Sequence, residues 1–333
     1  MTLSGNKKSL QKKQSKIGKT IEKLARLDID EELREKILPY CRLKKGEIWE
    51  DPKGKHKVGV LDAASNSDTK ILFEKEKAQL VINDPPYNVV VGNVNTQSLS
   101  KINIEEYIKF SRKWVSNAIS ILDKAASLYI WLGADQNDGF QPLPEFMILM
   151  REFNELKTRS FITMRNQRGY GTQKNWMSVR QELLYYVKGN PDFKVIYTDI
   201  PKILGGYYKE VNGEVTDNFE RSKSEFIRPG NVWVDIQQVF YRMEENVPGA
   251  YAQKPLKSIS RIIEASSKKS NLVGDFFSHS GVTLLASEIL GRKCYALEID
   301  PVFAELSIRR LEHFRKTGRT GWQWNNPFPE III

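Results

Sequence analysis

The chain has 333 residues, of which 40% are hydrophobic and 28% charged, and its formal net charge is +10. It contains no apolar run of the roughly 20 residues that a membrane-spanning helix needs, and its lysine-rich start lacks the apolar segment of a secretory signal. Two cysteines and three histidines without metal-ligand spacing exclude a zinc site, so the composition predicts a cytoplasmic protein without a metal or a membrane partner.

Basic residues concentrate at the N-terminus. Residues 1–45 carry 13 Lys or Arg and 6 Asp or Glu, so most of the net charge lies there. Apolar residues at helical spacing predict a small helical hairpin at 17–40, in which Asp30 caps the second helix and Pro39 ends it. We therefore expect a basic helical arm at 1–50 that contacts phosphates. A solvated, disordered tail is the alternative for the first 16 residues.

Strand-like and helix-like segments alternate between residues 51 and 190. Strands are expected at 57–62, 78–83, 127–133, 159–166 and 182–189, and helices at 104–122 and 142–153. The polar segment between the last two strands, residues 167–181, is expected to form a loop. Strands that alternate with helices predict an α/β protein with a doubly wound sheet.

The alternation stops between residues 191 and 250. This stretch is polar, carries 7 Lys or Arg against 10 Asp or Glu, and has an Asn-Gly pair at 212–213 that predicts a hairpin. It is interpreted as an inserted, irregular module.

The alternation resumes at 251–316 and leaves residues 317–333 as a tail. Helices are expected at 255–267, 283–291 and 301–314, and strands at 271–277 and 293–299. Asp300 and Pro301 are typical of the cap and first turn of a helix.

The stretch INDPPYNVV places four unusual residues directly behind an expected strand: Asp84, Pro85, Pro86 and Tyr87. Proline cannot continue a strand ladder or a helix interior, so this exit from the strand is rigid. A carboxylate, a stiffened backbone and an aromatic ring together indicate a binding pocket.

A second stretch, DFFSHSGVTLLASEILGRKCYALEIDP, has the layout of a nucleotide-binding β-α-β unit. One strand ends at Asp275, a turn of small residues follows, a helix begins near Thr283, and the next strand ends at Glu298. An acidic residue at that second end can bind both ribose hydroxyls. The turn lacks the G-x-G-x-x-G pattern, which disfavours NAD. A tight loop with a solvent-facing Glu298 is the structural alternative.

Together the two stretches resemble the S-adenosylmethionine-dependent amino-methyltransferases of DNA. Their order resembles the beta group of that family, because Asp84 precedes Asp275 and the insertion lies between them. The segment AYAQKPLKSISRIIEASS is similar to the family's Gln-Lys-Pro-Leu helix. The resemblance covers residues 55–315. It implies a Rossmann-like methyltransferase sheet with permuted motif order, a catalytic half at 51–190, a target recognition region at 191–250 and a cofactor-binding half at 251–316.

The resemblance also assigns roles to residues. It implies that Asp84, Pro85, Pro86 and Tyr87 are catalytic. Those implied to bind S-adenosylmethionine are Asp62, Asp84, Lys254, Asp275, Phe276, Phe277, Ser278, His279, Ser280, Gly281, Thr283, Glu298 and Ile299. The family usually has Gly at position 279 and Pro at position 276. A side chain at 279 would crowd the methionine part of the cofactor, so His279 is either a structural filler or a donor to the cofactor carboxylate.

The tetrad suits methyl transfer to an exocyclic amine, whose lone pair is delocalised into the ring. The Asp84 carboxylate and the Pro85 carbonyl can accept hydrogen bonds from the amine and free that lone pair. Tyr87 can stack on a base that has left the duplex. An aspartate-led tetrad implies adenine N6 by the resemblance. Cytosine N4, an amino group of RNA or protein, and an inactive DNA-binding relative remain alternatives, whereas the sequence around Cys41 and Cys294 excludes cytosine C5.

Basic and aromatic residues alternate in RNQRGYGTQKNWMSVRQE, which suits a surface for phosphates and bases. The candidates for nucleic-acid contact are Arg165, Arg168, Tyr170, Lys174, Trp176 and Arg180. The alternative is a solvated loop with Trp176 in the core. Double-stranded DNA is the expected partner. A cognate restriction endonuclease is a further candidate, as is a homodimer joined through the 17–40 hairpin.

Overall fold

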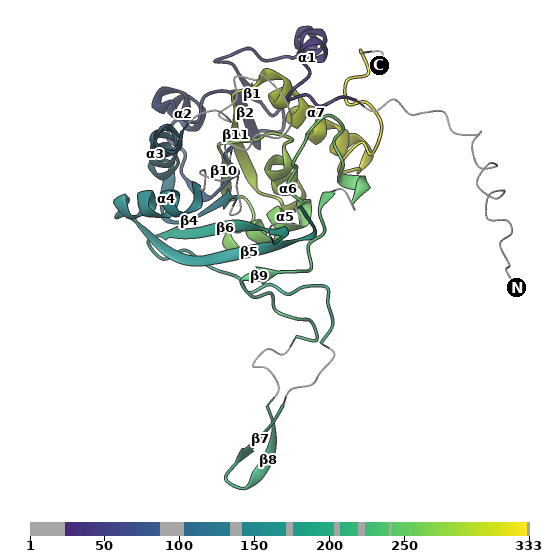
Figure 1. The fold of residues 1–333 in the computed structure, drawn as a ribbon. Coiled ribbons are helices and arrows are strands. Elements are labelled where there is room, and N and C mark those ends of the chain that lie inside the picture. The colour runs from purple at the N-terminus through teal and green to yellow at the C-terminus, as the bar shows by residue number, and fades with distance from the viewer. Residues whose placement is uncertain are drawn as a thin grey trace, which may run out of the picture.

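The computed structural model describes residues 24–86, 103–133, 142–170, 176–202, 207–218, 224–239 and 242–331. Its centre is a nine-stranded sheet with the strand order β1-β2-β11-β10-β3-β4-β6-β5-β9 (Figure 1). These strands are β1 (Ile48–Glu50), β2 (His56–Val60), β3 (Ala78–Asn83), β4 (Leu122–Leu132), β5 (Leu156–Tyr170), β6 (Ser178–Lys188), β9 (Val232–Trp233), β10 (Leu272–Asp275) and β11 (Lys293–Glu298). From β2 to β4 neighbouring strands are parallel, and β6 and β5 add an antiparallel extension.

Helices cover both faces of this sheet (Figure 1). They are α1 (Glu31–Ile37), α2 (Asn66–Phe73), α3 (Ile104–Ser120), α4 (Pro142–Leu149), α5 (Leu256–Ser266), α6 (Val282–Leu290) and α7 (Pro301–Thr317), with short 3-10 turns η1 (Leu38–Tyr40), η3 (Met150–Glu152) and η5 (Met243–Glu245). Side chains of successive strand residues point to opposite faces. Val81 of β3 therefore packs in the cluster of α2, α3 and α4, whereas Leu80 and Ile82 pack in the cluster of α5 and α6. The doubly wound α/β prediction is confirmed.

A separate hairpin of β7 (Tyr207–Val211) and β8 (Glu214–Asn218) projects away from the sheet (Figure 1). Its turn consists of Asn212 with φ 58° and Gly213 with φ 81°. Two consecutive positive φ angles favour an Asn-Gly pair. The hairpin predicted at 212–213 is confirmed.

The long antiparallel pair of β5 and β6 corrects the prediction of a loop at 167–181. β5 continues to Tyr170 and β6 begins at Ser178, so much of this polar segment is strand. Arg165 pairs with Arg180 in register. The prediction was wrong because these strands continue beyond their apolar segments, where polar side chains no longer show a buried face.

The predicted helical hairpin at 17–40 is confirmed only in its second half. Asp30 caps α1 by accepting a hydrogen bond from the Leu33 amide at 3.0 Å. Residues 24–30 form no helix, and residues 17–23 lie outside the described residues. Where the chain is described, no helix is long and apolar enough to cross a membrane.

Candidate active site

Two parallel neighbouring strands bring the two sequence motifs together. β3 and β10 pair with Leu80 opposite Val273, so their carboxyl ends meet at one edge of the sheet. Asp84 follows β3, and Asp275 is the last residue of β10. The buried Asn83 side chain connects the end of β3 with the turn that follows β10, because its Oδ1 accepts a hydrogen bond from the Phe276 amide at 3.0 Å. Ligands of open α/β sheets bind at this kind of edge.

A buried cation holds the Asp84 carboxylate. The Lys254 Nζ lies 2.6 Å from Asp84 Oδ2, and Lys254, which precedes α5, is only 5% exposed. The same ammonium group lies 5.4 Å from the centre of the Trp131 ring. A buried charge needs a partner of opposite sign, and the Asp84 carboxylate supplies one for Lys254.

The turn after β10 is built from backbone hydrogen bonds. The Phe277 amide donates to Asp275 Oδ1 at 2.9 Å, and the Ser278 amide donates to the Leu297 carbonyl at 2.9 Å. Gly281 has φ 71°, and a β-carbon there would lie 2.6 Å from Cβ of Ser307 in α7. Only glycine satisfies both the backbone conformation and this close approach.

His279 also has a left-handed backbone, with φ 45°. Its ring packs on Phe303 of α7 with 4.6 Å between ring centres, and burial lowers its pKa to about 4. The imidazole is therefore neutral at pH 7. This packing supports the interpretation of His279 as a structural filler, and the left-handed backbone explains why glycine suits the position.

Two carboxyl groups in the site have raised pKa values. Burial raises the pKa of Asp275 to about 7 and that of Glu298 to about 7. Glu298 accepts hydrogen bonds from the His279 amide at 2.7 Å and from the Asp300 amide at 3.1 Å. These amides favour the charged form but do not offset the burial. Such pKa shifts are frequent in functional sites.

The predicted cofactor residues fall into two groups. Asp84, Lys254, Asp275, Phe277, Ser278, His279, Ser280 and Thr283 line one cavity of about 20 Å³ together with Ile82, Trp131, Ile259 and Val282. A second group lies at the ends of β2 and β11, where the Leu61 amide donates to the Glu298 carbonyl at 3.0 Å. Asp62 and the 60% exposed Ile299 flank this contact.

Two residues that line the cavity each have a buried polar atom without a hydrogen-bond partner among the described residues, namely Ser278 Oγ and Trp131 Nε1. Buried polar groups are normally paired, so unpaired ones indicate a place for a ligand. A cavity of about 20 Å³ has room for about one water molecule, so a cofactor of nucleoside size has to widen it.

Comparison with known proteins identifies the family. The family model described as "DNA methylase", for N6 and N4 amino-methyltransferases, matches residues 78–309. The chain belongs to this family. The family consists of S-adenosylmethionine-dependent amino-methyltransferases of DNA, which agrees with the resemblance of the two motifs.

Curated relatives of this DNA methylase are enzymes of the same kind. Type II methyltransferase M.HpaI of Haemophilus parainfluenzae is 26% identical over 240 residues, which are 72% of this chain and 70% of that protein. DNA adenine methyltransferase YhdJ of Escherichia coli is 27% identical over 248 residues, 71% of this chain and 77% of that protein.

Solved structures share the fold. The PvuII DNA methyltransferase, described as cytosine-N4-specific, has a TM-score of 0.52 at 14% identity and covers 76% of this chain and 85% of its own. The M1.HpyAVI–SAM complex has a TM-score of 0.50 at 15% identity, with 77% and 98% covered. The Rossmann-like methyltransferase sheet is therefore confirmed.

Not all predicted site residues of the DNA methylase meet in the cavity. Phe276 turns into the core and stacks on Phe73 with 5.9 Å between ring centres, so its side chain cannot contact a ligand there. Pro85 is buried and Pro86 exposed. Tyr87 and Lys174 lie outside the described residues.

Four of the six predicted DNA-contacting residues lie on β5 and β6, and Trp176 lies just before β6. Leu132 at the end of β4 pairs with Glu182, so Arg165 and Arg180 continue beyond the edge of the sheet at which Asp84 lies. Arg168 and Tyr170 belong to the same extension of β5. Trp176 is 94% exposed, which excludes the alternative that it packs in the core.

Two residues of the site were not predicted from the sequence, Asn83 and Trp131. Asn83 is the last residue of the strand expected at 78–83, and Trp131 lies within the strand expected at 127–133. Strand alternation puts Trp131 on the same side of the sheet as Tyr129, two residues earlier, and that side carries α5, but alternation alone does not show that the ring reaches the cavity.

Proposed function

We propose that this DNA methylase transfers a methyl group to the exocyclic N6 of an adenine that has been flipped out of duplex DNA. The observation that carries the proposal is the Asp84 carboxylate, fixed by Lys254 at 2.6 Å beside the turn that follows Asp275. The aspartate-led tetrad and the similarity to the adenine methyltransferase YhdJ both favour adenine.

The residues at the end of β3 act on the amine. Asp84 accepts a hydrogen bond from one N–H of the amino group and the Pro85 carbonyl accepts a hydrogen bond from the other, which turns the nitrogen lone pair toward the methyl donor. Positioning of this kind can account for much of the rate acceleration. Lys254 keeps the carboxylate in place, and Tyr87 stacks on the base. The amine loses its proton after transfer, so no general base is needed.

S-adenosylmethionine supplies a methyl group on a sulfonium, and two sets of residues are proposed to hold it. Glu298 accepts hydrogen bonds from the ribose hydroxyls, while Asp62 and Ile299 contact the adenine. The turn 277–281 and Lys254 enclose the methionine part, where Ser278 Oγ and the Asp275 carboxyl are available for its polar groups.

Duplex DNA is the proposed substrate, contacted by the β5–β6 hairpin, the region 191–250 and the basic arm at 1–50. A cognate restriction endonuclease is the proposed partner, because several relatives are named Type II methyltransferases. A homodimer through the N-terminal region is a further proposal.

Cytosine N4 is the second candidate base. Its amine would use the same two acceptors, and the PvuII enzyme with the same fold is described as cytosine-N4-specific. RNA, protein and loss of activity are the remaining alternatives to be tested.

The test is transfer of labelled methyl from S-adenosylmethionine to mixed-sequence duplex DNA, followed by digestion and separation of the nucleosides. We expect label in N6-methyl-2′-deoxyadenosine and none with Asp84→Ala. Label in N4-methyl-2′-deoxycytidine would keep the mechanism and overturn the choice of base. Measurable cofactor binding without label in DNA would direct the search to RNA or protein.

A further inference from the structure

A second and larger cavity lies on the α5 face of the sheet. Its volume is about 890 Å³, within the range of about 300–1,000 Å³ of ligand sites. It is lined by β4, β5 and β6, by the segments around residues 190–196 and 228–233, and by α5. We call it the arm-root groove, because both of these segments lead to the β7–β8 hairpin. Trp233 lines it and contacts Trp131 edge-on at 6.5 Å between ring centres, so the groove adjoins the catalytic cavity.

Aromatic rings form a stacking surface in the arm-root groove. Tyr129 and Tyr185 stack with 4.2 Å between ring centres and an interplanar angle of 6°. The Tyr129 hydroxyl is fixed by Ser266 Oγ at 2.8 Å. Phe193 lies 6.4 Å from Tyr185, and it is 52% exposed although it is a large apolar side chain. Bases of a strand stack about 3.4 Å apart, so a base between two rings needs about 7 Å. The planes of Phe193 and Tyr185 are inclined by 30°, so insertion of a base requires the exposed Phe193 ring to move outward and turn parallel to Tyr185.

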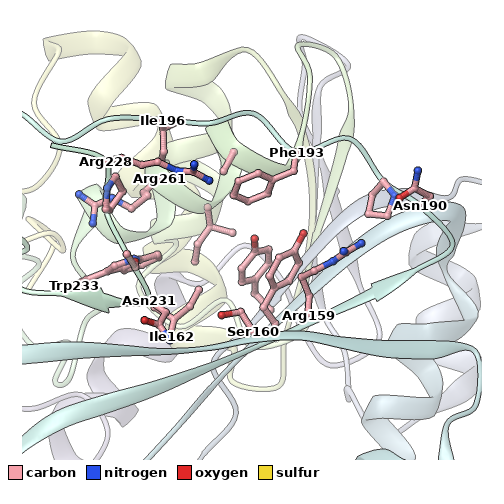
Figure 2. A pocket seen from close by; sticks show the side chains of 17 residues that line it. Arg159, Ser160, Ile162, Asn190, Phe193, Ile196, Arg228, Asn231, Trp233 and Arg261 are labelled. Carbon is pink, nitrogen blue, oxygen red and sulfur yellow. The ribbon is translucent and has the colours of Figure 1, made fainter. Parts of the chain in front are cut away.

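The charges of the groove are all positive. Arg159, Arg228 and Arg261 line it, and no carboxylate does so among the described residues. Arg261 is committed to the structure, because its NH1 binds Asp235 at 2.9 Å and its guanidinium lies over the Trp233 ring. Arg159 and Arg228 are exposed. Figure 2 shows Arg159 at one end of the groove and Arg228 at the other, with Phe193 between them.

We propose that the arm-root groove binds one unpaired nucleotide of a DNA strand. Its base inserts between Phe193 and Tyr185, and the phosphates on its two sides reach Arg159 and Arg228. A base with protein rings on both faces cannot remain stacked in a duplex, so the nucleotide has to be extrahelical or single-stranded. The proposal adds a site to the proposed function, and it does not depend on which base is methylated.

The experiment measures binding of a fluorescently labelled oligothymidylate by anisotropy. Thymine has no exocyclic amino group, so this probe is not a substrate of the proposed reaction. Phe193→Ala removes the stacking ring. We expect it to weaken binding about tenfold, since stacking of one base contributes roughly 1–3 kcal/mol. Phe193→Trp should restore the affinity. Phe193 is exposed, and so are the arginines that the charge variants replace. Thermal unfolding verifies that each variant is folded.

The charge variant is Arg159→Ala combined with Arg228→Ala. Loss of two phosphate contacts should reduce the salt dependence of binding by about 1.4 in log–log slope, at about 0.7 per phosphate of a single strand. Arg151→Ala is the matched control, because Arg151 is an exposed arginine of η3, which packs with α4 on the other face. It should leave the slope and the affinity unchanged.

Equal affinity of the wild type and Phe193→Ala for the oligonucleotide, or no binding by the wild type, overturns the proposal. Competition by thymidine monophosphate distinguishes a nucleotide within a strand from a free nucleotide. If the monophosphate displaces the labelled probe as strongly as unlabelled oligonucleotide does, the ligand is a free nucleotide and the proposal of a DNA strand is overturned. Asp84→Ala separates this site from the catalytic one, because it should bind the oligonucleotide normally even if no methyl transfer is detected with any DNA.

Discussion

At the scale of single residues, the pair of Lys254 and Asp84 is the contact on which the proposed mechanism depends. Lys254→Met should lower methyl transfer at saturating cofactor by about tenfold or more, because a hydrogen bond to a charged group is worth about 1.5–3 kcal/mol. Lys254→Arg should recover part of the rate.

Lys257→Met is the matched control for this prediction. Lys257 lies three residues further along and binds Asp199 at 2.8 Å, at a more exposed position. If both methionine variants are equally active, Lys254 does not position Asp84.

The raised pKa values of Asp275 and Glu298, each about 7, predict proton release when the cofactor binds. Hydroxyl and ammonium donors of a ligand favour the charged carboxylates and so lower both pKa values. Near pH 7 the protein should therefore release protons on binding, and release should decline well above that pH because both groups are then already ionised. Calorimetry in buffers of different ionisation enthalpy measures the number. Glu298→Gln should release fewer protons, and an equal number would contradict the assignment of Glu298.

Substitution of Gly281 should lower the free energy of unfolding through two effects, backbone strain and steric overlap, which a second glycine can separate. Gly281→Ala adds a β-carbon 2.6 Å from Ser307, whereas Gly318→Ala has the same kind of backbone, with φ 73°, and no atom within 4 Å. Both variants incur backbone strain of about 1 kcal/mol. Gly281→Ala should lose a further 1–3 kcal/mol or so of unfolding free energy to overpacking. Denaturant unfolding of both variants measures the difference, and similar losses would show that the turn relaxes.

At the scale of elements, the β7–β8 hairpin is separable from the main sheet. It pairs only with itself among the described strands, and its two connections approach where the Lys202 amide donates to the Glu225 carbonyl at 2.9 Å. Replacement of residues 203–223 by a short Gly-Ser linker should therefore preserve folding and cofactor binding. We expect it to abolish site-specific methylation, measured as label in defined duplexes.

The control for this deletion is unfolding temperature. An unchanged unfolding temperature together with unchanged methylation of the same sites would show that the hairpin does not take part in target recognition.

Elements with a clear apolar period or a turn motif such as Asn212-Gly213 could be predicted from the sequence, whereas the polar ends of long strands could not. α3 shows seven buried side chains on one face, and its predicted range differs from Ile104–Ser120 by only two residues. The extended ends of β5 and β6 are polar. They are strands because their backbones pair with each other, and such pairing leaves no pattern in the sequence. The site was predictable where a local motif marks it, as at Asp84 and Asp275. It was not predictable at Trp131, because only the register of the sheet directs that ring toward the cavity.

At the scale of the whole molecule, the two proposed halves form one sheet. β2 and β3 belong to the first half, yet β11 and β10 of the second half lie between them. The fragment 24–190 should therefore not fold alone, because its strands lack their central neighbours. Circular dichroism and amide exchange of the fragment test this expectation, and cooperative unfolding of the isolated fragment would contradict it.

The same strand order has a consequence for synthesis on the ribosome. β3 and Asp84 leave the exit tunnel nearly two hundred residues before β10, and the two places between β2 and β3 are filled by β11 and β10, the last two described strands of the chain. Pairings between segments so far apart in the chain form slowly. A nascent chain thus carries the Asp84 motif without the neighbouring strand β10. Until β10 and β11 have been made, β2 and β3 each keep an unpaired strand edge at which another chain could pair.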